Sequence, residues 1–258
     1  MKVQVNSINL FYEEYGQGVP IILLHGFPLN HLIWNDVVPY LIGQARVITP
    51  DLRGHGQSDA PEGVYTMAML AEDITGLMDA LGLARAIVVG HSMGGYAALA
   101  LALKAPSRVA GIGLVATQAA ADTPERKAGR YASVEDVRQW GLRNLAESMS
   151  ANLTSRGDLQ PLVRQMILST RPEGVIGSLK GMAERPDVTG QLGRIHGPAV
   201  VVAGDADKLV PLEKSQTMAR GLPDSRLVVI SSAGHLPMME APREVADALG
   251  GLINPAGA

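Results

Sequence analysis

Apolar residues gather along this chain in short, continuous runs that are separated by longer amphipathic segments. The runs occupy residues 21–24, 47–48, 86–89, 112–115, 200–202 and 227–230. Because they are continuous rather than alternating, they favour strands that are covered on both faces, as in a parallel sheet. Residues 3–5 and 10–14, near the beginning of the chain, predict an antiparallel pair at the edge of that sheet.

Helical periodicity fills the intervals between these runs. In residues 69–81, apolar side chains recur at Ile74, Leu77, Met78 and Leu81, which is the spacing of one helix face. Further helices are predicted directly after Ser92 and over residues 245–253. Strands that alternate with helices predict an α/β fold with a mostly parallel central sheet and helices on both of its faces.

Residues 118–187 interrupt this alternation, because they contain no strand-like run. They carry three helical stripes instead, over residues 134–145, 159–167 and 175–182. Pro172 stands where the start of a helix tolerates proline, and Pro186 marks the exit. We therefore expect a core of residues 1–117 and 188–258 with an inserted helical region of residues 118–187. We favour a cap over the substrate site for this region over a set of additional packing helices.

Composition narrows the classes of function. The 258 residues are 47% hydrophobic and 18% charged, which is typical of a globular protein. The net charge of −3 argues against nucleic acid as a partner, and the absence of cysteine excludes disulfides and thiolate catalysis. The beginning of the chain does not resemble a signal peptide, and no apolar run approaches the length of a membrane span. We expect a cytoplasmic protein without a membrane partner; the sequence leaves monomer or homo-oligomer open.

Residues 90–94 read Gly-His-Ser-Met-Gly and match the pattern Gly-x-Ser-x-Gly. Such a match is weak when it stands alone, but this one directly follows the predicted strand 86–89 and opens a predicted helix. A sharp strand-to-helix turn of this kind projects the serine hydroxyl above the carboxyl ends of the strands. The context therefore predicts Ser92 as a nucleophile, in preference to a structural serine in a glycine-rich turn.

A serine nucleophile that attacks a carbonyl needs two donors for the oxyanion that forms. The backbone N–H of Met93, the residue after the nucleophile, is the first candidate. The second is the N–H of Phe27 in the His-Gly-Phe-Pro loop that follows strand 21–24, where Gly26 permits close approach and Pro28 has no N–H. We expect His25 to be a buried residue that ties this loop together rather than a catalytic group.

Of the six histidines in the chain, His235 is the predicted general base, because it lies on a loop just past strand 227–230. The acid should lie between the serine and the histidine along the chain. Asp205 and Asp207 both follow strand 200–202. We prefer Asp207, which lies deeper in the loop, because a residue directly after the glycine more often caps the turn.

Five motifs in this order resemble the α/β-hydrolase superfamily over essentially the whole chain. They occupy residues 25–28, 51–58, 90–95, 204–211 and 234–242. The resemblance implies that Asp207 is the acid, that Asp51 and Arg53 form a structural turn, and that Glu240 stabilises a loop. Within the superfamily, the chain is similar to small carboxylesterases and to the 3-oxoadipate enol-lactonase-like group, which carry a helical cap in this place.

The resemblance implies a serine carboxylesterase that hydrolyses small esters of short to medium acyl chain through an acyl-enzyme, with no cofactor and no metal. Ser92 stands where haloalkane dehalogenases and epoxide hydrolases place a carboxylate, and His91 where carbon–carbon bond hydrolases usually have Asn. Phe27, His91, Trp140 and Met166 are the predicted substrate-binding residues. Alternatives are a lactonase, a cofactor-free perhydrolase and, from another class, a small-molecule receptor on the same fold.

Overall fold

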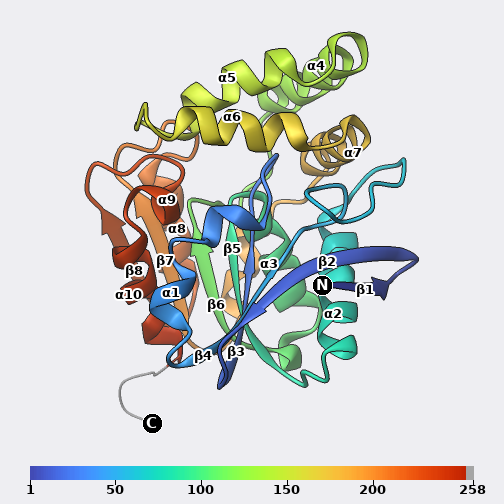
Figure 1. Ribbon diagram of the computed structural model, residues 1–258. Coiled ribbons are helices and arrows are strands. Elements are labelled where there is room, and N and C mark those ends of the chain that lie inside the picture. Colours follow the sequence, from blue (N-terminus) through green and yellow to red (C-terminus); the bar gives the residue numbers. More distant parts are fainter. Residues whose placement is uncertain (254–258) are drawn as a thin grey trace.

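The computed structural model describes residues 1–253, in which eight strands form one mostly parallel sheet (Figure 1). The strands are β1 (Lys2–Val5), β2 (Ile8–Tyr15), β3 (Val19–Leu24), β4 (Ala45–Pro50), β5 (Ala86–His91), β6 (Val109–Val115), β7 (Ala199–Gly204) and β8 (Ser225–Ile230). Their order across the sheet is β1-β2-β4-β3-β5-β6-β7-β8. β1 pairs antiparallel with β2 and β2 with β4, whereas the remaining neighbours are parallel. The predicted α/β class and the antiparallel edge pair are confirmed. Of the predicted core segment 188–258, residues 254–258 lie outside the described residues.

Helices cover both faces of this sheet. They are α1 (Val38–Leu41), α2 (Met67–Ala80), α3 (Met93–Lys104), α8 (Leu212–Gly221), α9 (Pro237–Glu240) and α10 (Pro242–Ile253), with short 3-10 helices η1 (His31–Trp34), η2 (Pro106–Arg108) and η3 (Thr189–Arg194). In β3, Ile22 and Leu24 belong to the hydrophobic cluster formed with α2, α3 and α8. Ile21 and Leu23 belong to the opposite cluster, formed with α1 and α10. The continuous apolar run of β3 is therefore explained by burial on both faces.

The predicted helical insertion lies between β6 and β7 and contains α4 (Pro124–Trp140), α5 (Arg143–Leu153), α6 (Gln160–Ser169) and α7 (Pro172–Ala183). It has four helices rather than the three stripes expected from periodicity. The stripe at residues 134–145 is divided because Gly141 takes a φ of 72° and ends α4. A backbone N–H in that left-handed conformation caps the helix, and Gly141 N–H donates to the Val137 carbonyl at 2.9 Å.

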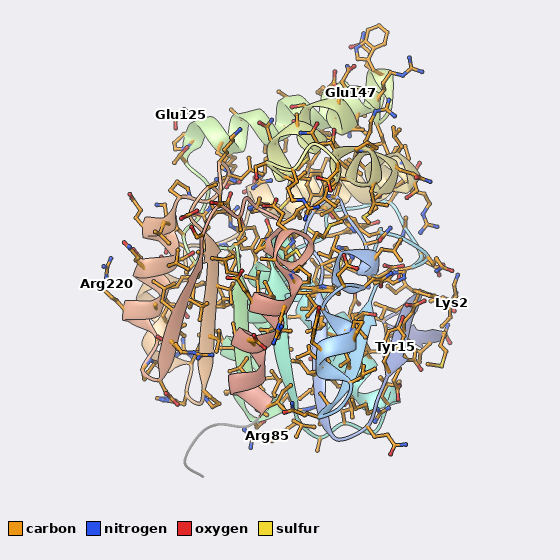
Figure 2. The ribbon with its side chains drawn as sticks, turned by 60° about the vertical axis from the view of Figure 1, so that its left-hand side comes forward. Lys2, Tyr15, Arg85, Glu125, Glu147 and Arg220 are labelled. Atoms are coloured by element: carbon orange, nitrogen blue, oxygen red, sulfur yellow. The ribbon has the colours of Figure 1, made fainter. Side chains whose placement is uncertain are left out.

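The helical insertion lies across one end of the sheet, and Figure 1 shows α5 and α6 side by side in this layer. In Figure 2, Glu125 of α4 and Glu147 of α5 mark the outer side of the layer, while Arg85, which precedes β5, lies at the opposite end of the molecule. The insertion therefore faces the carboxyl ends of the parallel strands. No helix within residues 1–253 combines the length and the apolarity needed to cross a bilayer.

Candidate active site

Ser92 occupies the turn between the end of β5 and the beginning of α3. Its backbone has φ 50° and ψ −112°, a conformation that a residue with a side chain rarely adopts. Two contacts with the end of β6 hold it there: Ser92 N–H donates to the Val115 carbonyl at 2.9 Å, and the Thr117 hydroxyl donates to the Ser92 carbonyl at 2.7 Å. The strained turn predicted for this motif is present.

The serine hydroxyl is the first member of a chain of three polar side chains. Ser92 Oγ lies 3.0 Å from Nε2 of His235, and Nδ1 of the same imidazole lies 2.8 Å from Oδ2 of Asp207. The carboxylate accepts a hydrogen bond from Nδ1–H, so Nε2 presents its lone pair to the serine O–H. The His235 side chain is 3% exposed and that of Asp207 is 1% exposed. The three residues come from the ends of β5, β7 and β8, which are far apart in the sequence.

Asp205 and Asp207, the two candidates for the acid, have different hydrogen-bond partners. Asp207 reaches His235, while its second oxygen accepts the backbone N–H groups of Leu209 at 2.8 Å and Val210 at 3.0 Å. Asp205 instead accepts the N–H of Ser232 at 2.6 Å. Asp205 thus ties the turn after β7 to the loop after β8, and Asp207 alone of the two is bonded to the imidazole.

Residues 25–29, called here the oxyanion loop, lie beside the serine. A Cβ added to Gly26 would lie 2.5 Å from Nδ1 of His91 and 3.0 Å from Cβ of Ser92. Only a glycine permits this approach. Within residues 1–253, the backbone N–H groups of Phe27 and Met93 have no hydrogen-bond partner. Both predicted donors are therefore free, on the two segments that meet at Ser92.

His91 does not lie in an open pocket. Its ring is fully buried, Nε2–H donates to the carbonyl of His235 at 2.8 Å, and the two imidazole rings are 4.9 Å apart. Burial, followed by repulsion from His235, holds the pKa of His91 well below its ordinary value, so the ring is neutral. The side chain predicted to bind substrate contacts the predicted general base instead, and its role toward substrate stays a prediction.

The other predicted substrate-binding residues have different environments. Phe27 is 7% exposed in the oxyanion loop, and Met166 is 3% exposed on α6. Trp140, the last residue of α4, is 62% exposed, so most of its ring surface faces solvent. Helical periodicity does not indicate that the side chain at the end of α4 is exposed to solvent. All three assignments stay predictions.

His25 fastens the oxyanion loop to the loop after β4, as expected for a tying residue. Its Nδ1–H donates to the Gly26 carbonyl at 2.9 Å, and its Nε2 accepts the Leu52 N–H at 2.9 Å. Burial lowers the pKa of His25 to about 4, which keeps the imidazole neutral and able to accept at Nε2. The arrangement fixes one neutral tautomer of His25, with the proton on Nδ1.

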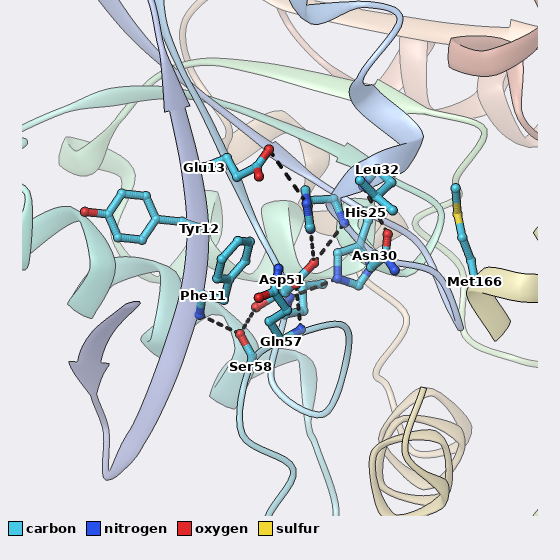
Figure 3. A network of polar contacts seen from close by, with 12 residues as sticks. Phe11, Tyr12, Glu13, His25, Asn30, Leu32, Asp51, Gln57, Ser58 and Met166 are labelled. Carbon is cyan, nitrogen blue, oxygen red and sulfur yellow. Dashed lines mark hydrogen bonds and ion pairs between the residues drawn. The ribbon is translucent and has the colours of Figure 1, made fainter. Parts of the chain in front are cut away.

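Asp51 lies at the centre of a second polar network (Figure 3). It accepts the N–H of His31 at 2.9 Å, the ring Nδ1–H of His31 at 2.7 Å and the N–H of Gln57 at 2.8 Å. Burial opposes ionisation of Asp51, but the hydrogen bond from His31 and the nearby histidines hold its pKa below the ordinary value. Asp51 and Arg53, which pairs with Asp73 at 2.6 Å, stabilise the turn as predicted. His31 was missed because no motif surrounds it.

A serine hydroxyl bonded to an imidazole, which is in turn bonded to a carboxylate, can act as an activated nucleophile. Free N–H groups nearby can bind a developing oxyanion. Among residues 1–253, no group of three His, Asp or Glu side chains is placed to hold a metal ion.

Comparison with known proteins places this site in a family. The family model of the alpha/beta hydrolase fold matches residues 19–242. The chain belongs to the α/β-hydrolase family. A structure of a thermophilic esterase from Thermogutta terrifontis superposes on this α/β-hydrolase with a TM-score of 0.95 at 40% identity, covering 100% of this chain and 99% of the other. The enol-lactonase from Burkholderia xenovorans LB400 superposes with a TM-score of 0.92 at 26% identity, covering 98% and 99%.

A longer relative shares only part of its length with this α/β-hydrolase. The dihydrolipoyllysine-residue acetyltransferase component of the acetoin cleaving system of Pseudomonas putida is 33% identical over 258 residues. The match covers 95% of this chain but 66% of that protein. The chain is thus a hydrolase of the α/β fold that resembles esterases and enol-lactonases, with an inserted helical region of α4–α7.

Proposed function

We propose that this α/β-hydrolase is a serine carboxylesterase that acts on small carboxylic esters through an acyl-enzyme. The observation that carries the proposal is the continuous contact from Ser92 Oγ through His235 to Asp207, at 3.0 and 2.8 Å. The likeness to the Thermogutta terrifontis esterase, at 40% identity over the full chain, supports the choice of esters.

In the proposed acylation step, Ser92 Oγ attacks the ester carbonyl carbon while Nε2 of His235 takes the hydroxyl proton. The carbonyl oxygen becomes an oxyanion, which the free N–H groups of Phe27 and Met93 bind. Collapse of this tetrahedral intermediate breaks the bond to the alkoxy oxygen, and His235 gives its proton to the departing alcohol. Asp207 keeps Nδ1 protonated and stabilises the imidazolium that forms in between.

In the proposed deacylation step, a water molecule takes the place of the alcohol. His235 removes a proton from the water as its oxygen attacks the acyl carbon, and the same two N–H groups bind the second oxyanion. Collapse then breaks the bond to Ser92 Oγ, which recovers its proton from His235, and the carboxylic acid leaves. Water is the one co-reactant that the two steps consume besides the ester.

The helical insertion supports a preference for uncharged acyl groups. The buried side of α6 presents Val163, Met166 and Ile167, which are at most 3% exposed. All three belong to a buried hydrophobic cluster; a substrate group placed against it would meet apolar side chains, which favours short- to medium-chain alkyl groups over charged ones, because an unpaired charge is costly to bury. We therefore place α4–α7 as the substrate cap, with Met166 and Phe27 as contacts of the acyl or alcohol group.

A lactonase is the second candidate, because the enol-lactonase from Burkholderia xenovorans covers 98% of this chain at 26% identity. A lactone is a cyclic ester, so the same three residues would open it by the same steps. The alcohol would then stay attached to the acyl group throughout, and deacylation would release a single hydroxy acid, or a keto acid from an enol lactone.

Initial rates on p-nitrophenyl esters of increasing acyl length, beside a set of lactones, test the proposal. We expect Ser92-dependent turnover that is fastest with short acyl chains, and a loss of about 10⁶-fold in kcat for Ser92→Ala. Faster opening of lactones than of esters would favour the second candidate. Ser92→Ala enzyme that kept a tenth of the activity would contradict both, since both need this nucleophile.

A further inference from the structure

The segment that joins α5 to α6 in the helical insertion is linked, through Glu240 of α9, to residues 231–237, called here the histidine loop. Thr154 directly follows α5, six residues before α6 begins; its hydroxyl donates to Oε1 of Glu240 at 2.6 Å and accepts the Arg156 N–H at 3.1 Å. The other oxygen of the same carboxylate, Oε2, accepts the N–H of Gly234 at 2.6 Å, and Gly234 directly precedes His235. Thr154 is 2% exposed. One carboxylate thus joins the insertion to the backbone that carries the predicted general base.

The residue that follows α6 is hydrogen-bonded to the oxyanion loop. Thr170 follows α6, and its hydroxyl lies 3.1 Å from the carbonyl oxygen of Pro28 and 3.2 Å from that of Met166. Its single proton is shared between the helix and the loop. Thr170 is 4% exposed, so water does not compete freely for this proton. Pro28 directly follows Phe27, whose N–H is one of the free donors.

Between these two ties, the buried side of α6 packs in the hydrophobic cluster that also holds both loops. Val163 and Ile167 of α6 are fully buried there. Leu29 of the oxyanion loop and Leu236 of the histidine loop belong to the same cluster and are also fully buried. Figure 1 shows α6 lying across this end of the sheet. α6, a single helix, therefore packs in the same buried cluster as the histidine loop and the oxyanion loop.

We propose that residues 154–170, which contain α6, are a positioning element that sets the spacing between the imidazole of His235 and the oxyanion donors, with Thr154 and Thr170 as its two attachment points. This proposal rests on the serine esterase function proposed above. The base must reach Ser92 while the N–H groups reach the oxyanion, and small errors in such a geometry are costly to rate. A helix is stiffer than the loops it joins, so it can hold both at a fixed separation.

Valine replaces the threonine hydroxyl with a methyl group of similar size, whereas serine keeps the hydroxyl. We expect Thr154→Val and Thr170→Val each to lower kcat on a short-chain p-nitrophenyl ester by about tenfold, with KM changed less than about twofold. Thr154→Ser and Thr170→Ser should restore most of the rate. Thr217→Val is the control, because the Thr217 hydroxyl donates to the Glu213 carbonyl and accepts from Arg220, both within α8; its kcat should equal that of the native enzyme.

The double variant Thr154→Val/Thr170→Val shows whether the two threonines act together as one positioning element or as two independent local contacts. If α6 must be attached at both ends to hold the spacing, either single change releases it, and Thr154→Val with Thr170→Val should cost no more than the larger single loss. Losses that multiply to about a hundredfold, or single variants with native kcat, would overturn the proposal. A melting temperature measured for each variant separates a positioning effect from partial unfolding, and the serine variants keep the test valid if a valine variant fails to fold.

The outcome is distinguishable from a failure of the proposed function. If the protein shows no Ser92-dependent turnover of any ester or lactone, both the proposed esterase function and the positioning role are contradicted. Native turnover that depends on Ser92 but is unaffected by the threonine changes would remove the positioning role alone. The rate of Ser92 modification by a fluorophosphonate should fall with kcat in both valine variants, because it needs the same base and the same donors.

Discussion

Asp207 and Asp205 follow the same strand, yet their carboxylates bind different parts of the molecule. Asp207 lies 2.8 Å from the imidazole of His235, whereas Asp205 accepts a backbone N–H from Ser232. We therefore expect Asp207→Asn to lower kcat by about 10⁴-fold, because the amide no longer favours the tautomer that leaves Nε2 free. Asp205→Asn should change kcat only a few-fold. Steady-state kinetics of the two variants measure the difference, and the reverse ranking would assign the acid to Asp205.

His91 offers a second test at this scale, since it holds the backbone of His235 through its Nε2–H. Glutamine can place an N–H near the position of Nε2, and leucine cannot. We expect His91→Leu to lower kcat/KM by about tenfold and His91→Gln to retain most of it. Urea unfolding of both variants controls for stability. Equal losses in kcat/KM at equal stability would show that the hydrogen bond to the His235 carbonyl has no part in catalysis.

The predictability of individual residues follows how local their signals are. Ser92, Asp207 and His235 each stand in a short pattern directly after a strand, so their juxtaposition could be anticipated from sequence. Thr117 and His31 could not, because no local pattern marks them, although their partners lie only 25 and 20 residues away. Burial of a single aromatic side chain is equally non-local, and Trp140 illustrates it.

The same reasoning applies to the helices and strands. Continuous apolar runs gave the inner strands correctly, since burial on both faces leaves a clear trace in sequence. Periodicity over residues 134–145 missed the break between α4 and α5, because a glycine within a stripe can either continue a helix or end it. The φ of 72° at Gly141, which ends α4, is a backbone conformation that periodicity does not encode.

Helix α7 is the element of the insertion that meets the core backbone most closely. Tyr65 N–H donates to the Gly177 carbonyl at 3.0 Å, and a Cβ added to Gly181 would lie 1.7 Å from the Tyr65 carbonyl oxygen. A methyl group at residue 181 would therefore push the helix away from the loop before α2. This contact fixes α7, while α6 is held through side chains.

We expect Gly181→Ala to destabilise the protein by about 1–3 kcal/mol, because close packing leaves no space for the added methyl group. Gly129→Ala is the matched control: Gly129 lies within α4, and an added Cβ would meet nothing within 4 Å. That change should stabilise the protein by about 0.5–1 kcal/mol through helix propensity. Urea unfolding gives both free energies. A stabilising Gly181→Ala would mean that α7 does not touch the core backbone.

Across the whole molecule, three buried histidines are held neutral near the site. Burial lowers the pKa of His25 to about 4 and that of His55 to about 3, and it holds the pKa of His91 well below its ordinary value. His55 is fully buried with its ring 5.1 Å from that of His25, and its Nδ1–H donates to the Arg53 carbonyl at 3.0 Å. At His25 the neutral form is required, because Nε2 accepts a hydrogen bond; at His55 and His91 the second ring nitrogen is buried without a partner, so a proton there would be a buried, unpaired charge.

Stability should therefore fall as the pH falls below about 6.5, where histidines of the unfolded chain bind protons that the folded protein cannot accept. Each buried histidine adds up to about 1.4 kcal/mol per pH unit to the slope of the unfolding free energy until its folded pKa is reached. Urea unfolding at pH 7, 6 and 5 measures that slope.

His55→Asn keeps a donor near Nδ1 without a titrating group, so it should reduce the slope by the contribution of one proton. Equal slopes for native protein and His55→Asn would mean that His55 accepts a proton in the folded state, and a buried charge would then have to be stabilised beside His25.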